Sequence, residues 1–340
     1  MRYRLLSGTG VYVSELCLGA MTFGGEGVWK VIGALDQNGV SQLVHRALDA
    51  GVNFFDTANM YAYGESETML GQALEGRRRD IILATKVRGR MGKGVNQVGL
   101  SRVHILQEIE ASLKRLRTDY VDLYQIHSFD PFTEMEETLR ALDDLVRAGK
   151  VRYIGCSNLA AWQVMKALGL SRQHGLAAFR STQSYYSLAG RDLEREMIPM
   201  IQDQKLGLLV WSPLAGGFLS GKYTRGGTDQ TARRVKFDFP PVDKDRAYDI
   251  IEVLKDIAAR HSASVPRIAL AWLLAQPAVT SVIIGAKKPE QLDDNLKAVD
   301  ITLSADELKA LDEVSRLSPE YPGWMLSAPT DRTPGLDRRF

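Results

Sequence analysis

Four side chains suited to proton transfer lie at, or just beyond, the ends of short apolar segments. Asp56 comes near the end of the segment VNFFDT, Lys86 ends DIILATK and His127 ends VDLYQIH, while Tyr61 follows Asp56 by five residues. Lysine is among the residues least often buried without a partner, so an apolar segment that ends on Lys86 requires a carboxylate nearby. Asp56 can supply that carboxylate if its segment lies beside that of Lys86.

Together these side chains could help to reduce a carbonyl group. The reference pKa of a phenol such as Tyr61 is about 10, so it keeps its proton at neutral pH. A neighbouring ammonium lowers that pKa toward the range useful for a general acid. His127 could donate a hydrogen bond to the carbonyl oxygen as negative charge develops on it. The reaction also needs a hydride, which no side chain supplies, so we expect a hydride-carrying cofactor beside these residues.

The elements that must position these residues alternate between short β-branched runs and longer segments of helical period. Strands that are apolar on both faces and separated by helices form parallel sheets, and eight such repeats favour a closed barrel. We therefore predict an α/β fold, one (β/α)8 TIM barrel domain over residues 1–340. The expected strands are residues 14–19, 52–57, 80–86, 121–127, 151–158, 179–184, 206–212 and 281–286.

The sequence also predicts elements other than the barrel strands. The opening YRLLSGTGVYVS predicts a β-hairpin that plugs the N-terminal end of the barrel. Residues 101–116 predict a helix capped by Ser101, and residues 133–149 predict one that opens with a Thr133–Glu136 capping box and closes on Gly149. Residues 214–247 are expected to form a long loop, and an extra C-terminal helix precedes a tail at 318–340.

Composition excludes several classes of function. The chain is 45% hydrophobic and 25% charged with a net charge of +2, as in ordinary soluble proteins, and it lacks the basic stripe of a nucleic-acid-binding surface. No apolar run is long enough to span a membrane, and no signal peptide is apparent. The two cysteines, Cys17 and Cys156, lie far apart in apolar runs. We expect a cytoplasmic protein with no metal site and no membrane partner.

Nearly the whole chain resembles the aldo-keto reductase superfamily, and particularly its bacterial reductases and potassium channel β-subunits. The resemblance implies a (β/α)8 barrel, NADPH as hydride donor and a tetrad of Asp56, Tyr61, Lys86 and His127. Tyr61 is then the general acid; residue type alone does not choose between Tyr61 and Tyr63, but the family's five-residue interval from the aspartate does. The matching motifs are LCLGAMTFGG, GVNFFDTANMYAYGESETMLG, ILATK, VDLYQIHSFDP, LVRAGKVRYIGCSN, VWSPLAGGFLSGKY and VIIGAKKPEQLDDNL.

The same motifs imply the cofactor contacts. Met21 and Asp56 belong to the expected cofactor-binding set. The other members are assigned by the part of the cofactor that they would contact: Ser157, Asn158 and Gln183 hold the nicotinamide carboxamide, Trp211 stacks on its ring, Ser212, Leu214, Gly216 and Lys222 line the pyrophosphate, and Gly285, Lys287, Gln291, Asp294 and Asn295 hold the adenosine end.

Simpler interpretations stand beside these assignments. Ser157 and Asn158 are good N-cap residues for the helix that follows them, and Trp211 could pack in the core. Gln183 could simply satisfy backbone groups within the barrel. Lys287 precedes the first turn of a predicted helix, where a cation opposes the helix dipole. A bound anion such as the 2′-phosphate of NADPH would remove that conflict; solvation of the lysine is the alternative.

The leading hypothesis is an NADPH-dependent reductase of aldehydes or ketones. The alternative is a cofactor-binding regulatory module, similar to potassium channel β-subunits, with slow turnover. Substrate identity and oligomeric state are not predicted. Candidate apolar wall residues are Phe23, Trp29, Met60, Met91 and Trp324, of which Trp29 lies in an insertion at residues 26–39.

Overall fold

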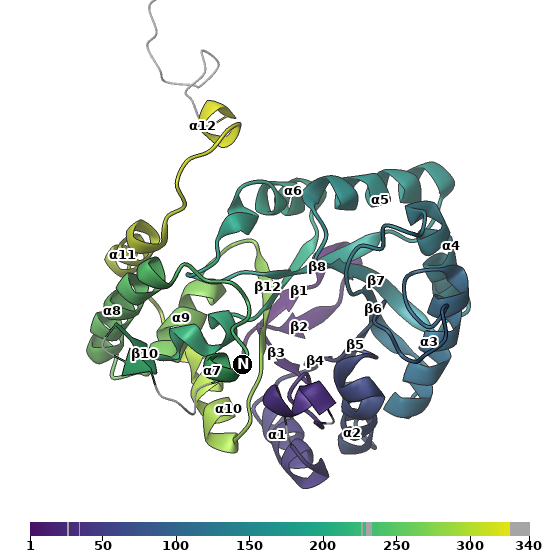
Figure 1. Ribbon diagram of the computed structural model, residues 1–340, viewed down its shortest axis with the longest axis horizontal. Coiled ribbons are helices and arrows are strands. Elements are labelled where there is room, and N and C mark those ends of the chain that lie inside the picture. Colours follow the sequence, from purple (N-terminus) through teal and green to yellow (C-terminus); the bar gives the residue numbers. More distant parts are fainter. Residues whose placement is uncertain (26, 34, 226, 229–232, 327–340) are drawn as a thin grey trace, which may run out of the picture.

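The eight predicted strands form one closed parallel barrel in sequence order, as a computed structural model shows (Figure 1). The model describes residues 1–25, 27–33, 35–225, 227–228 and 233–326. The predicted (β/α)8 barrel is confirmed. Its strands are β3 (Leu16–Gly19), β4 (Phe54–Asp56), β5 (Ile82–Val87), β6 (Val121–Ile126), β7 (Val151–Ser157), β8 (Phe179–Tyr185), β9 (Gly207–Trp211) and β12 (Val279–Ile284).

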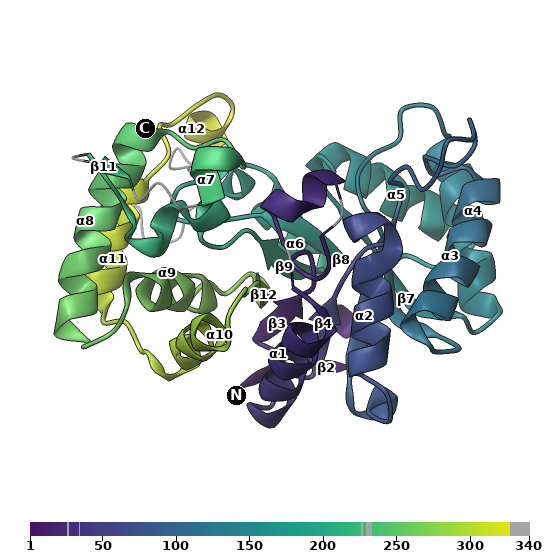
Figure 2. The same ribbon diagram turned by 60° about the horizontal axis from the view of Figure 1, so that its bottom comes forward.

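Helices surround the barrel and cover the outer face of its sheet (Figures 1 and 2). Their apolar faces and the outward side chains of the strands make up the main core. They are α1 (Gln37–Asp49), α2 (Glu65–Ala73), α3 (Arg102–Leu116), α4 (Met135–Arg147), α5 (Ala161–His174), α6 (Met197–Gln204), α8 (Lys244–Arg260), α9 (Val265–Leu274), α10 (Pro289–Leu296) and α11 (Ala305–Ser315).

The N-terminal hairpin closes one end of the barrel, as predicted. Strands β1 (Tyr3–Leu5) and β2 (Tyr12–Ser14) pair antiparallel. Leu6 and Val13 are fully buried and join the cluster of barrel-interior side chains that includes Phe54 and Leu209. Because apolar groups fill this end, the polar side chains inside the barrel lie toward its other end, where the strands finish.

Of the two expected helix starts, one is confirmed and one is wrong. Ser101 does cap α3, since its side chain accepts a hydrogen bond from the His104 amide. No capping box opens α4, however: its N-cap is Glu134, while the Thr133 hydroxyl donates instead to Asp130 at 2.8 Å. Glu136 is drawn into an ion pair with Arg140 one turn later.

The segment expected to be one long loop contains several short elements. They are η6 (Ala215–Ser220), β10 (Tyr223–Thr224), β11 (Gly227–Thr228) and α7 (Arg233–Lys236), and α8 starts at Lys244. Buried Arg234 joins this segment together by donating to the carbonyl oxygens of Ala215 and Pro240. This guanidinium therefore ties the turn after β9 to the chain that precedes α8.

The remaining elements are short 3-10 turns and the C-terminal segment. The turns are η1 (Ser7–Thr9), η2 (Gly27–Val31), η3 (Tyr61–Gly64), η4 (Arg78–Asp80), η5 (Asp192–Glu194) and η7 (Lys297–Asp300). Beyond α11, the extra C-terminal helix, the predicted tail includes α12 (Gly323–Leu326), and residues 327–340 lie outside the described part. None of the described helices has both the length and the apolar character needed to cross a bilayer.

Candidate active site

A buried ion pair occupies the mouth of the barrel. The Lys86 Nζ atom lies 2.5 Å from the Asp56 Oδ1 atom, and both side chains are almost fully buried. The parallel register of β4 and β5 places Asp56 opposite Ala84, two residues before Lys86. The partner that Lys86 requires is therefore the one expected from the sequence.

The second oxygen of Asp56 is held by two amides. Gln125 and Gln183 each donate an Nε2–H to Asp56 Oδ2, at 3.1 and 2.9 Å. Gln183 is thus occupied with a side chain, so the suggestion that it serves only backbone groups is wrong. Gln125 was missed in the sequence, although it precedes His127, the residue after β6, by two residues. Four strands of the barrel contribute to this one cluster.

Tyr61 reaches the ion pair from η3. Its hydroxyl lies 3.3 Å from Lys86 Nζ, which also donates to the Thr57 carbonyl oxygen at 2.8 Å. Tyr61 is 9% exposed, whereas Tyr63 is 59% exposed. The structure therefore separates the two tyrosines and brings Tyr61 to the cluster.

Burial dominates the acidity of Tyr61. Burial raises the pKa of the Tyr61 phenol above its ordinary value; Lys86 lowers it and Asp56 raises it further. Lys86 thus lowers this pKa in the expected direction, but burial outweighs its effect, so the expectation of a lowered pKa is wrong. Burial alone would lower the pKa of Lys86, but Asp56 and Tyr61 raise it above its ordinary value. At neutral pH the phenol holds its proton beside a charged ammonium.

His127 faces the same phenol as a neutral imidazole. The rings of Tyr61 and His127 meet edge to face with centroids 5.6 Å apart. Burial, with added repulsion from Lys86 and Arg88, lowers the pKa of His127 to about 3. Its Nδ1 atom is buried and has no hydrogen-bond partner among the described residues. Tyr61 thus contacts both Lys86 and His127.

The residues expected at the nicotinamide form a connected set on β7, β8 and β9. Ser157 donates to the Gln183 carbonyl oxygen at 2.8 Å, and Asn158 donates to the His127 carbonyl oxygen at 2.9 Å. The Trp211 indole N–H donates to Asn158 Oδ1 at 3.0 Å. The helix that follows is capped at Ala160, so the N-cap interpretation of Ser157 and Asn158 is wrong.

Trp211 has aromatic neighbours rather than a place in the main core. Its ring lies 5.8 Å from that of Phe239, nearly parallel to it, and 5.2 Å from that of Tyr185 at a tilt of 36°. Trp211 only packs at the edge of the barrel-interior cluster and is partly exposed. The ring therefore lies at the rim of the barrel mouth.

The residues expected at the pyrophosphate begin in a sharp turn after β9. Ser212, Ala215, Gly216 and Gly217 all have positive φ, and Ser212 Oγ accepts the Gly216 amide at 2.8 Å. The amides of Ala215 and Gly217 also donate within the turn, to the carbonyl oxygens of Ser212 and Leu214. A Cβ atom at Gly216 would lie 2.2 Å from the Phe239 carbonyl oxygen, so only glycine fits there. Leu214 is partly buried in this turn and Lys222 is exposed beyond it.

The residues expected at the adenosine end cluster around the start of α10. Gln291 Oε1 accepts the Lys287 amide at 2.9 Å, and Lys287 Nζ lies 3.4 Å from the Val31 carbonyl oxygen. Asp294 is paired with Arg267, which the sequence reading missed, at 2.6 Å. The other expected contacts are exposed Gly285, buried Asn295 and half-buried Met21, which follows the neighbouring strand β3.

The residues expected to line the substrate pocket lie in different parts of the structure. The Trp29 ring lies 5.7 Å from that of Tyr61, so the insertion does reach the tetrad. Met60 lies against Gly89 beside Tyr61. Phe23 is 1% exposed and belongs to the main core, so it is not an open wall. Half-buried Met91 is in the loop after β5, while Trp324 lies on α12, which extends beyond the barrel (Figure 1).

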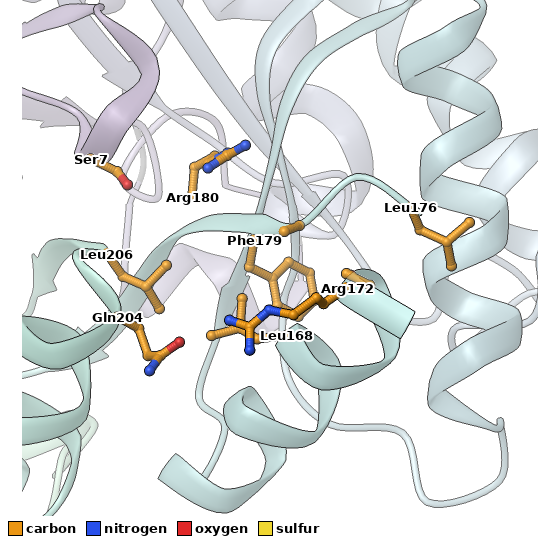
Figure 3. Close-up of a pocket in the computed structure, with 10 residues that line it drawn as sticks. Ser7, Leu168, Arg172, Leu176, Phe179, Arg180, Gln204 and Leu206 are labelled. Carbon is orange, nitrogen blue, oxygen red and sulfur yellow. The ribbon is translucent and has the colours of Figure 1, made fainter. Parts of the chain in front are cut away.

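A surface cavity lies away from this site. It has a volume of about 210 Å³ and is lined by Arg172, Phe179, Arg180 and Leu206, among others (Figure 3). It lies where β8 and β9 begin, the end of a barrel at which residues contribute to stability rather than to catalysis. Among the described residues, no group of three or more His, Cys, Asp or Glu side chains could hold a metal ion.

Comparisons with known proteins agree with the fold and the geometry. The model of the aldo/keto reductase family matches residues 15–316. The chain is 38% identical to an uncharacterized oxidoreductase, YrpG, from Bacillus subtilis, over 92% of this chain and 96% of that protein. It is 37% identical to a probable voltage-gated potassium channel subunit beta from Oryza sativa, over 88% of this chain and 92% of the other.

A relative with a named reaction falls in the same range. The chain is 33% identical to the versiconal hemiacetal acetate reductase of Aspergillus parasiticus, over 92% of this chain and 96% of that protein. The family match covers the barrel from β3 to the end of α11 and includes every residue of the tetrad. The chain belongs to the aldo/keto reductase family and is an oxidoreductase by its relationships.

Proposed function

We propose that this protein reduces aldehydes or ketones to alcohols with NADPH as hydride donor and Tyr61 as general acid. The observation that carries the proposal is the 3.3 Å contact between the Tyr61 hydroxyl and Lys86 Nζ, which is itself fixed by Asp56. A protonated phenol beside a buried ammonium has few structural uses. It suits a reaction in which the phenol loses its proton.

Each side chain of the tetrad has its own role in delivering the proton. Tyr61 donates its proton to the carbonyl oxygen, and Lys86 stabilises the resulting phenolate. Asp56 keeps Lys86 charged and in place. His127, neutral because of its burial, donates a hydrogen bond to the same oxygen, since a preorganised donor stabilises charge as it develops. Bound NADPH would supply the hydride to the carbonyl carbon.

The groups around the barrel mouth fit such a cofactor. Exposed Lys222, just beyond the turn at Ser212–Gly217, offers a cation for a pyrophosphate. Asn158 contacts His127 and Trp211 contacts Asn158, and a nicotinamide near them could deliver its hydride to the same carbonyl. Lys287 and Lys288 are exposed at the N-terminus of α10, a position suited to the 2′-phosphate. Two buried free cysteines fit a reducing cytoplasm.

A second candidate function is supported by one relationship. Probable potassium channel β-subunits from Oryza sativa and Arabidopsis thaliana are 37% and 35% identical to this chain. A cofactor-binding module with slow turnover would share the barrel and the cofactor contacts. The two functions differ in whether proton donation by Tyr61 limits the turnover of cofactor.

Replacement of Tyr61 tests the proton donor. Tyr61→Phe is expected to lower kcat by about 10²- to 10⁴-fold for a panel of aldehydes, because general acid catalysis contributes that much. Tyr63→Phe removes an exposed phenol two residues away and should leave kcat near the wild-type value. Turnover would be followed as loss of nicotinamide absorbance. Equal rates for wild type and Tyr61→Phe would contradict the assignment.

Replacement of Lys287 tests the choice of cofactor. Lys287→Ala should weaken NADPH binding about tenfold, the effect of losing one charge-assisted hydrogen bond, and leave NADH binding unchanged. Lys297→Ala, just past the other end of α10, serves as the matched control. Titration of cofactor fluorescence measures both affinities. An unchanged ratio of NADPH to NADH affinity in Lys287→Ala would show that Lys287 does not bind the phosphate.

The protonation state of His127 is testable by NMR. Because burial lowers its pKa to about 3, the His127 ring signals should stay at their neutral positions. They should not titrate across about pH 5 to 8, where exposed histidines do. The exposed rings of His45 and His174 provide signals for comparison, and His127→Gln assigns the signal. A midpoint near neutrality would mean that an imidazolium, not an imidazole, faces the substrate.

A further inference from the structure

A second buried charge cluster lies behind the loop that carries Tyr61, outside the barrel sheet. Arg115, near the C-terminus of α3, donates from Nε to Glu67 Oε2 on α2 at 2.6 Å. Its Nη2 atom lies 3.6 Å from Glu108 Oε2, also on α3. The side chain of Glu67 is fully buried and that of Glu108 is nearly so. One guanidinium therefore serves two carboxylates that have little access to water.

Each carboxylate is attached to a segment of the active site. Glu67 accepts a hydrogen bond from the Thr85 hydroxyl at 2.5 Å, and Thr85 directly precedes Lys86. Glu108 accepts a hydrogen bond from Asn59 Nδ2 at 2.9 Å, and Asn59 comes two residues before Tyr61. The backbone N–H of Asn59 donates to the Lys86 carbonyl oxygen at 3.1 Å. The cluster thus joins the two segments whose side chains meet in the site.

The loop itself is in a strained conformation that its surroundings must maintain. Ala62 and Tyr63 have φ of 47° and 54°, values that cost energy for residues other than glycine. Gly64 has φ of 96°, and a Cβ atom there would lie 2.7 Å from Arg115 Cδ. The stem of Arg115 therefore packs directly on the end of η3, while its guanidinium binds the carboxylates.

Arg115 is the member of the cluster whose loss would leave both buried carboxylates without a cation. Removal of one partner from a buried ion pair leaves an uncompensated charge and is strongly destabilising locally. Without Arg115, Glu67 and Glu108 would be two buried carboxylates near each other. They would take up water or move apart, and Asn59 and Thr85 would move with them. A shift of about 1 Å in a reacting group can lower a rate by about 100-fold.

We infer that Arg115 is a positioning residue for carbonyl reduction, holding Tyr61 and Lys86 at their working separation through Glu67–Thr85 and Glu108–Asn59. The inference rests on the proposed role of Tyr61 as general acid. Arg115 touches neither the tetrad side chains nor the expected substrate, so it acts only through these contacts. The competing explanation is that the cluster merely stabilises the packing of α2 on α3.

Kinetics with a matched control separates the two explanations. Arg115→Met should lower kcat about 10- to 100-fold, the cost of misplacing the acid, and leave the NADPH affinity within about twofold. Arg115→Lys, which keeps the charge, should recover part of the rate. Arg117→Met is the control, because Arg117 follows on the same chain segment and pairs with exposed Glu75. It should leave kcat unchanged.

A spectroscopic measurement makes the test independent of turnover. With tyrosines labelled at 13Cζ, Tyr61→Phe identifies the Tyr61 signal. In Arg115→Met this signal should shift, and its titration midpoint should change, because the phenol moves relative to Lys86 and Asp56, the charges that face it. Glu108→Gln, which keeps the size of the side chain, should shift the signal in the same way. It provides the test if Arg115→Met fails to fold.

Two outcomes would overturn the inference. One is that Arg115→Met melts at a lower temperature than the wild type but has the wild-type kcat at temperatures where the variant is folded. The other is an unchanged Tyr61 signal in both Arg115→Met and Glu108→Gln. If the wild type reduced no carbonyl compound, the proposed function would fail, whereas the NMR comparison would still decide whether Arg115 positions Tyr61.

Discussion

The buried ion pair of Asp56 and Lys86 is the constraint on which the site depends. An ammonium inside a barrel is costly unless it is paired and fully hydrogen-bonded. Lys86 satisfies this demand with the Asp56 carboxylate and the Thr57 carbonyl oxygen. Asp56 in turn takes two amide donors, Gln125 and Gln183, from strands across the barrel. The register of the barrel strands must be correct for any of these contacts to form.

The division of the barrel into an apolar end and a polar end follows from the same demand. Leu6 and Val13 of the hairpin close one end with side chains that exclude water. Polar groups can then meet only at the other end, where the strands finish. There Lys86 keeps a charge next to Tyr61 and opposes the protonation of His127. Burial keeps Tyr61 protonated and His127 neutral, and repulsion from Lys86 adds to the effect of burial on His127.

The sequence was sufficient for the strands and for the pairing of Asp56 with Lys86, because both follow from periodicity and from the cost of burying lysine. The choice of Tyr61 over Tyr63 needed the family interval, and the structure explains it by the turn that buries one and exposes the other. The capping box at Thr133 was wrong because Asp130, three residues earlier, competes for the same hydroxyl.

Other features depend on three-dimensional contacts that have no local signal. Gln125 resembles any polar residue in a strand until its hydrogen bond to Asp56 is seen. The raised pKa of Tyr61 reflects burial by its whole surroundings, and the sequence shows only the neighbouring lysine. Arg115 lies 54 positions after Tyr61 in the chain, and only the packing of α3 beside α2 brings it under η3.

The most direct test of the account is the single-turnover rate of NADPH oxidation in a variant without the ion pair. The double variant Asp56→Asn/Lys86→Met leaves no buried charge unpaired, so its fold should persist, as its melting temperature would show. With Tyr61 intact, the account predicts that hydride transfer to a saturating aldehyde falls by at least about 100-fold while NADPH still binds. A rate within about threefold of the wild type would contradict the account, since Tyr61 would then donate its proton without the ammonium.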